Sequence, residues 1–146
     1  MPSVFRIGWP ILLPLTLLIG GCGTGDKEVR ARAVAEGYLK AVKDKDPDTA
    51  MSFFAKAYFE TRSPAGWKAD LRLITTRLGP LQSYSLRSSS WRTDFVPPDS
   101  GTHVTLQYDV RYAKHSAVET FLALKPFTRN EYKIVSHSIA SAGLMK

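Results

Sequence analysis

Residues 103–113 read His-Val-Thr-Leu-Gln-Tyr-Asp-Val-Arg-Tyr-Ala, and they carry the most regular pattern in the chain. Apolar or aromatic side chains occupy every even position from Val104 to Tyr112, and polar side chains occupy the odd positions between them. A repeat of two residues is that of a β-strand with one buried and one exposed face. The stretch therefore predicts a half-buried strand, around which the rest of the domain can be placed.

Three further strands are predicted on either side of this one. They are residues 81–93, where the pattern is mixed, and residues 117–124 and 131–139. Residues 96–101 form a turn-rich loop before the strand at 103–113. Residues 114–116 and 127–130 are short connections. Short connections favour hairpins, so the sequence predicts a four-stranded antiparallel sheet.

The pattern before residue 81 has a period of 3.6 residues and predicts three helices. The first runs from about residue 27 to 45 and carries an apolar face with Val34, Tyr38 and Val42. Asp46-Pro47 and Ser63-Pro64 each place a capping side chain before a proline, which predicts two further helix starts. The apolar faces expected in these two helices are Ala50, Phe53, Phe54, Ala57 and Tyr58, and then Trp67, Leu71, Ile74 and Leu78. Gly79 is the expected stop of the third helix.

Three helices followed by four strands make an α+β layout. A resemblance to a known family is carried by residues of the third helix and of the strands. They are Trp67, Leu71, Arg77, Leu78 and Gly79, then 104–108, and then Lys114, Val118, Glu119 and Thr120. Their order resembles that of the nuclear-transport-factor-2-like fold, and most closely a bacterial family of unknown function with that fold. The resemblance implies helices packed on a curved four-stranded antiparallel sheet to form a cone, over 28–141. Tyr132 stands where the family is expected to have tryptophan. Because that family has no established activity, it implies no catalytic residues.

The amino terminus has the pattern of an export signal. Arg6 precedes an apolar run, residues 7–21, that contains Pro10 and Pro14 and is too short to span a bilayer as a helix, which takes about 20 residues. Leu18-Ile19-Gly20-Gly21-Cys22 then resembles the bacterial lipoprotein lipobox and includes the single cysteine of the chain. The resemblance implies cleavage before Cys22, a diacylglyceryl group on its sulfur and an acyl chain, such as palmitate, on its nitrogen. The alternatives are a plain signal peptide or an uncleaved anchor, with a chance cysteine.

This resemblance divides the chain and places the protein. Residues 1–21 are the expected signal peptide, 22–27 a short lipidated tether, and 28–141 the domain. Gly23 replaces the aspartate that, in the Gram-negative sorting rule, retains lipoproteins at the inner membrane, so it favours the outer membrane facing the periplasm. The expected partner is the membrane, through the lipid on Cys22. With one cysteine, no intrachain disulfide can form.

The formal charge of +7 raises the question of a nucleic-acid partner. Loss of Arg6 with the signal peptide leaves 19 basic and 13 acidic residues, or +6. The basic residues alternate with acidic ones or are spread along predicted helices and strands, with no run of five like charges. Nucleic acid would also lie on the wrong side of the membrane. The charge therefore indicates a solvated surface beside an anionic bilayer, and no nucleic-acid partner is expected.

Few residues are candidates for catalysis. Asp109, His103 and His137 lie on predicted strands and are the candidate acids or bases, whereas His115 lies in a turn. A general base needs burial or a neighbouring group to bring its pKa to the working pH, and Asp109 sits on the polar side of its strand. Isolated histidines predict no metal site. No nucleophile-elbow or phosphate-loop motif is present, and no cofactor is expected.

The aromatic residues that could line a pocket are Tyr58, Trp67, Tyr84, Trp91 and Tyr108, although side chains at such spacing more often form core. Three hypotheses follow. The first is a non-enzymatic module that binds an envelope protein or a small ligand. The second is an isomerase or dehydratase with an acid or base inside the cone. A cone filled by residues such as Phe53, Trp67 and Leu106 would leave no room for its substrate. The third is a structural accessory with an exposed apolar patch.

Overall fold

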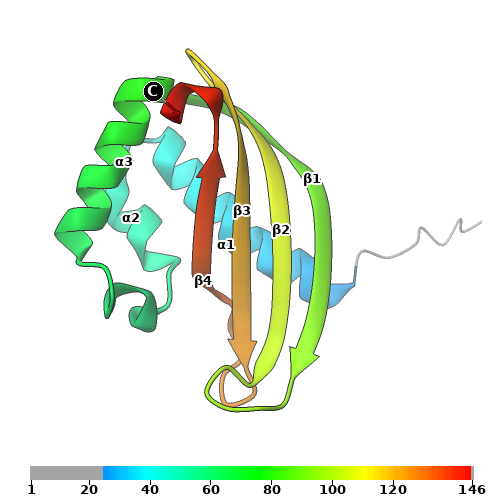
Figure 1. Ribbon diagram of the computed structural model, residues 1–146. Coiled ribbons are helices and arrows are strands. Elements are labelled where there is room, and N and C mark those ends of the chain that lie inside the picture. The colour runs from blue at the N-terminus through cyan, green and yellow to red at the C-terminus, as the bar shows by residue number, and fades with distance from the viewer. Residues whose placement is uncertain (1–24, 146) are drawn as a thin grey trace, which may run out of the picture.

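The computed structural model describes residues 25–145 (Figure 1). The expected signal peptide, Cys22 and Gly23 lie outside this range. The elements are α1 (Asp26–Lys43), α2 (Pro47–Ser52), the 3-10 helix η1 (Lys56–Phe59), α3 (Pro64–Leu78), β1 (Leu81–Asp94), β2 (Gly101–Tyr112), β3 (Ser116–Pro126), β4 (Lys133–Ala140) and the 3-10 helix η2 (Ala142–Leu144). Three α-helices and a four-stranded antiparallel sheet confirm the predicted α+β class.

The sheet is a meander in which each strand pairs with the next along the chain, in the order β1-β2-β3-β4. In the pairings, Val104 lies opposite Trp91 of β1 and opposite Ala123 of β3. All the even residues of β2 from Val104 to Tyr112 are buried, as the alternation predicts. We call their side of the sheet, which α1 covers, the inner face, and the opposite side the outer face (Figure 1).

Helix α1 lies across the inner face and contacts all four strands (Figure 1). Its buried side chains are three alanines and two larger residues: Ala31, Ala35, Tyr38, Leu39 and Ala41. Tyr38 sits at the centre of an aromatic cluster, with edge-on contacts to Phe54 at 5.5 Å, Trp67 at 6.5 Å and Phe121 at 5.4 Å between ring centroids. This cluster and the fully buried Leu106 fill the space between the helices and the sheet.

The second predicted helix is shorter than expected. It ends at Ser52, and Phe54 then forms an isolated bridge with Ile134 of β4 before a turn of 3-10 helix. The Ala55 amide donates to the carbonyl of Ile134 over 2.9 Å, and the Ile134 amide donates to the carbonyl of Phe53 over 2.9 Å. If residues 53–58 continued the helix, the carbonyl and amide of Ile134 on the edge of β4 would lose these partners. Pairing with β4 therefore overrides the helical pattern of residues 53–58.

The third helix begins and ends as predicted. The Ser63 side chain accepts a hydrogen bond from the Gly66 amide at 3.0 Å, and Pro64 follows at the first helical position. Gly79 ends the helix with φ of 84°, a conformation that favours glycine. Within residues 25–145, no helix is long and apolar enough to cross a membrane.

Candidate functional site

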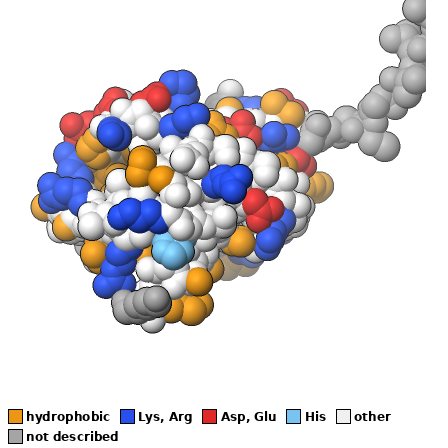
Figure 2. Space-filling model, turned by 90° about the horizontal axis from the view of Figure 1, so that it is seen from above, with side chains coloured by type: hydrophobic (Ala, Val, Ile, Leu, Met, Phe, Trp, Pro, Cys, Tyr) orange, Lys and Arg blue, Asp and Glu red, His pale blue; other side chains and the backbone are white. Residues whose placement is uncertain are grey.

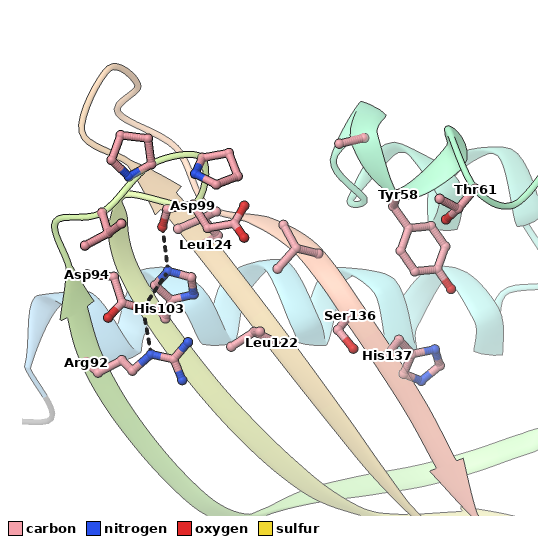
Figure 3. Close-up of a pocket in the computed structure, with 15 residues that line it drawn as sticks. Tyr58, Thr61, Arg92, Asp94, Asp99, His103, Leu122, Leu124, Ser136 and His137 are labelled. Carbon is pink, nitrogen blue, oxygen red and sulfur yellow. Dashed lines mark hydrogen bonds and ion pairs between the residues drawn. The ribbon is translucent and has the colours of Figure 1, made fainter.

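Two of the surface hollows that adjoin β4 are lined by both Tyr58 and His137. The larger, about 720 Å³, lies over the outer face of the sheet (Figure 3). Leu122 and Ser136 form its floor, between Tyr58 on one side and the chain after β1 on the other (Figure 3). The smaller, about 380 Å³, lies between β4 and α3 and is lined in part by Trp67 and Tyr38. Residue 137 thus borders both hollows.

His103 is buried at one end of the larger hollow, with 4% of its surface exposed. Its Nε2 lies 2.8 Å from the backbone oxygen of Asp99 and 3.4 Å from a carboxylate oxygen of Asp94. Arg92 in turn donates to that carboxylate at 2.8 Å (Figure 3). The Nδ1 atom is buried and has no hydrogen-bond partner among the described residues. Since one ring nitrogen is engaged and the other is inaccessible, His103 anchors the loop between β1 and β2 rather than facing a ligand.

His137 is held by a carboxylate that is completely buried. Its Nε2 lies 2.8 Å from Oε2 of Glu119, and the Tyr112 hydroxyl donates a short hydrogen bond to Oε1 of the same residue. The imidazole stacks on Phe121, with ring centroids 4.6 Å apart and planes at 9°, and Tyr38 meets it edge-on. Glu119 therefore fixes the orientation of the imidazole, and Nδ1 is the ring nitrogen left for a ligand at the hollows.

Burial sets the protonation of the tyrosines around this carboxylate. Desolvation raises the pKa of Tyr112 far above its usual value, and the charge of Glu119 adds to the effect. The pKa of Tyr38 is raised for the same two reasons. The Tyr112 hydroxyl consequently keeps its proton and acts as a donor to Glu119 at any ordinary pH. A carboxylate without exposed surface needs such donors, because an unpaired buried charge is strongly unfavourable.

The other candidate residues lie apart from this cluster. Asp109 is exposed on the outer face, where it forms an ion pair with Arg87 at 2.9 Å, and His115 is exposed in the turn between β2 and β3. Tyr108 is buried in the core and donates to Glu36 at 3.0 Å. Tyr84 is half-buried against Tyr108, and Trp91 is 58% exposed, so Trp91 does not belong to the core. In residues 25–145, no cluster of His, Cys, Asp or Glu is arranged to hold a metal ion.

Glu119 was missed as a candidate, although the sequence carries a signal for it. The odd residues of β3 from Ala117 to Ala123 face the core, and Glu119 is the one acidic residue among them. A carboxylate in the middle of an apolar alternation is a buried group that must have a partner. The partner, however, comes from β4, and its identity depends on strand register: Phe121 lies opposite His137.

Comparison of the chain with protein-family models, with curated proteins and with solved structures found no match. The features that bear on function are therefore the motif near the amino terminus and the geometry around β4.

Proposed function

We propose that the chain is a bacterial lipoprotein, anchored by lipid on Cys22 and exported to the envelope, where its domain acts as a non-enzymatic binding module. The observation that supports the anchor is the position of the lipobox-like stretch relative to the folded domain. Leu18–Cys22 ends four residues before Asp26, the first residue of α1, so a lipid at Cys22 would leave the domain intact and hold it close to the bilayer. Two or three acyl chains suffice for stable anchoring, whereas one chain binds only marginally.

The proposed fold family is the nuclear-transport-factor-2-like cone. Its support is the resemblance in the sequence, together with a helix laid across the inner face of an antiparallel sheet that bends around it (Figure 1). In this domain, Phe54, Trp67 and Leu106 fill the interior where a cone-shaped enzyme would hold its substrate. The described residues leave surface hollows instead, and two of them, beside β4, are lined by both Tyr58 and His137. A binding role for a small ligand or for a segment of an envelope protein fits this geometry.

The anchor is tested with the full chain expressed in a Gram-negative host. Intact mass of the membrane-extracted protein should correspond to residues 22–146 plus a diacylglyceryl and an acyl group, and a Cys22→Ser variant should lack both. Gly23→Ser is the matched control and should be lipidated normally. An unmodified thiol at residue 22 in the wild type would remove the lipoprotein proposal. Gly23→Asp should shift the lipidated protein from the outer to the inner membrane, and an unchanged distribution would remove the proposed outer-membrane location.

The binding role is tested at Tyr58 and His137, which border both hollows. A set of small aromatic and carboxylate fragments can be screened by ligand-observed NMR against the wild type and a Tyr58→Ala/His137→Gln double variant. Fragments that bind only the wild type would support the site. Asp109→Asn is the control, because this residue lies away from both hollows and is paired with Arg87. Fragment binding that is equal in all three proteins, or absent from the wild type, would refute it.

A second candidate function is an isomerase or dehydratase that uses His137 as a general base. The observation in its favour is the buried carboxylate that orients the imidazole and leaves Nδ1 for a substrate. Turnover of β-hydroxy or β,γ-unsaturated carbonyl compounds should then fall by about 10²–10⁴-fold in His137→Gln. Asp109→Asn should retain full activity. Lack of turnover by the wild type over a broad panel of such compounds would remove this candidate.

A further inference from the structure

Most of the exposed large apolar side chains in residues 25–145 gather at one end of the domain. Seven such side chains are exposed in this range, and five of them come from the start of α1, the end of β1 and the loops after β1 and β3. These five, which we call the apolar end, are Val29, Trp91, Phe95, Val96 and Phe127, with exposed fractions of 52%, 58%, 77%, 77% and 51%. The same end includes the start of the described chain (Figure 1).

Three contacts join these segments into one surface. Phe95 stacks on Phe127, with ring centroids 5.5 Å apart, and so links the loop after β1 to the loop after β3. The Lys27 ammonium lies 3.8 Å from the centroid of the Trp91 ring, which links α1 to β1. Arg30 of α1 donates to the backbone oxygen and side chain of Asn130, which links α1 to the loop before β4.

Charged side chains of both signs surround the apolar end. Lys27, Lys125 and Arg129 lie on these segments, and none of the three forms an ion pair within the described residues. Arg30 and Arg92 are paired with Asp26 and Asp94, and the other acids on these segments are Glu28, Asp99 and Glu131, so the basic and acidic side chains around the apolar end are equal in number. The opposite end of the domain differs, because its Lys and Arg side chains are dispersed and its apolar side chains scattered (Figure 2).

The position of Cys22 limits which surface can face a bilayer. Three peptide links join the Cα atoms of Cys22 and Gly25, so these atoms lie at most about 11 Å apart. A lipid on Cys22 would therefore hold the start of α1 near the headgroups, about one Debye length from an anionic surface. The part of the domain nearest that point is the apolar end.

We propose that the apolar end docks on the bilayer, with Trp91, Phe95 and Phe127 at headgroup level. This inference rests on the proposed lipid anchor. Aromatic side chains prefer the membrane–water interface, which favours this orientation. Val96 belongs to the apolar end and also lines the larger hollow, so docking would bring that hollow close to the bilayer.

The test uses the full-length protein, purified from membranes and reconstituted in vesicles of phosphatidylglycerol and phosphatidylcholine. After cleavage, residues 22–146 contain two tryptophans, the buried Trp67 and the exposed Trp91, so a Trp91→Phe variant isolates the Trp91 signal. Docked Trp91 should be quenched by brominated lipids, and more strongly by bromine near the headgroup than near the chain end, because an interfacial side chain penetrates only about 5–10 Å.

A Phe95→Ser/Phe127→Ser variant should lose most of this quenching while keeping its lipid. Leu73→Ser is the matched control, because Leu73 is 50% exposed but lies on α3, and its quenching should equal that of the wild type. Undiminished quenching in the double variant, or none in the lipidated wild type, would overturn the docking inference and leave the anchor intact. Quenching in a wild type that carries no lipid by mass would overturn the anchor and leave the docking surface.

Discussion

Glu119 is the residue on which the packing around β4 depends. It has no exposed surface, and its carboxylate is matched by the Tyr112 hydroxyl and by the ring of His137. Removal of one partner would leave a buried acceptor without its donor. Tyr112→Phe should therefore lower the free energy of unfolding by about 1–3 kcal/mol. Urea denaturation at neutral pH measures this difference. Tyr84→Phe is the control and should change the value by less, because Tyr84 is only half-buried.

The same tyrosine predicts how stability changes in alkali. Burial, reinforced by Glu119, raises the pKa of Tyr112 in the folded protein, while in the unfolded chain a tyrosine ionises near pH 10. The unfolded state thus loses protons first as the pH rises. The free energy of unfolding should be unaffected by this group below about pH 10 and should decrease above it.

Denaturation curves between neutral pH and the highest pH at which the chain is chemically stable would give this slope. Tyr112→Phe should start from a lower stability and decline less steeply above pH 10. A parallel decline of the two proteins would show that Tyr112 does not contribute to the pH dependence. Tyr108 adds to the slope in both proteins, because burial and the charge of Glu36 raise its pKa as well.

At the scale of the elements, α1 ends in a conformation that its sequence does not favour. Lys45 has φ of 59°, and the amides of Lys45 and Asp46 donate to the carbonyls of Val42 and Ala41, which is the Schellman pattern. Glycine is the usual residue at this position, because a side chain there costs about 1–2 kcal/mol. Lys45→Gly should therefore raise the free energy of unfolding by about 0.5–1 kcal/mol, after the greater freedom of glycine in the unfolded chain is counted.

Lys45→Ala separates the backbone effect from the loss of charge. It removes the ammonium group but keeps a Cβ at positive φ, so it should give no comparable gain. Equal stabilisation by glycine and alanine would point to charge rather than to backbone strain. Thermal unfolding of the three proteins in one buffer makes the comparison.

At the start of α3, a substitution is expected to lower the free energy of unfolding. Ser63 accepts a hydrogen bond from the Gly66 amide, one of the amides that a helix cannot satisfy from within. Ser63→Ala should cost about 1 kcal/mol in the free energy of unfolding, and Ser63→Asp should retain the cap and most of the stability. An unchanged free energy of unfolding in Ser63→Ala would mean that the hydroxyl makes no contribution as a cap.

Local patterns predicted those elements whose partners are local. The caps at Ser63 and Gly79 and the alternation in β2 are properties of short stretches, and the structure confirms them. The end of α2 is different, because residues 53–55 are held by Ile134, about eighty residues later in the chain. No helical period can report that pairing. For the same reason, the alternation in β3 could mark Glu119 as buried but could not name His137 as its partner.

At the scale of the whole molecule, the proposed anchor and the folded domain should be independent. Cys22 precedes the described residues, and one cysteine cannot crosslink the chain. Cys22→Ser should therefore leave the free energy of unfolding of the domain within about 0.5 kcal/mol of the wild-type value, even though it abolishes lipidation. Thermal unfolding of the wild type and of Cys22→Ser, both solubilised in detergent, measures this difference. A large loss of stability would mean that residue 22 packs on the domain.

The hollows beside β4 could not be predicted from the sequence, in contrast to the sheet. Each hollow is lined by residues from distant parts of the chain, and Tyr58 and His137 meet there only because η1 is placed against β4. Of the aromatic residues expected to line a pocket, some border a hollow and others do not. Tyr58 borders both hollows, whereas Tyr108 is core and Trp91 is exposed at the apolar end.

The meander order of the sheet has a consequence for how the chain folds. Every strand pairs with its neighbour in sequence, so each hairpin closes a short loop and can form soon after its two strands are available. Helix α1 is synthesised first but contacts all four strands, and its Arg30 bonds to Asn130, one hundred positions later. We expect the hairpins to form early and the amino-terminal helix to dock last, which would keep the chain incompletely folded until its carboxyl-terminal strand has emerged.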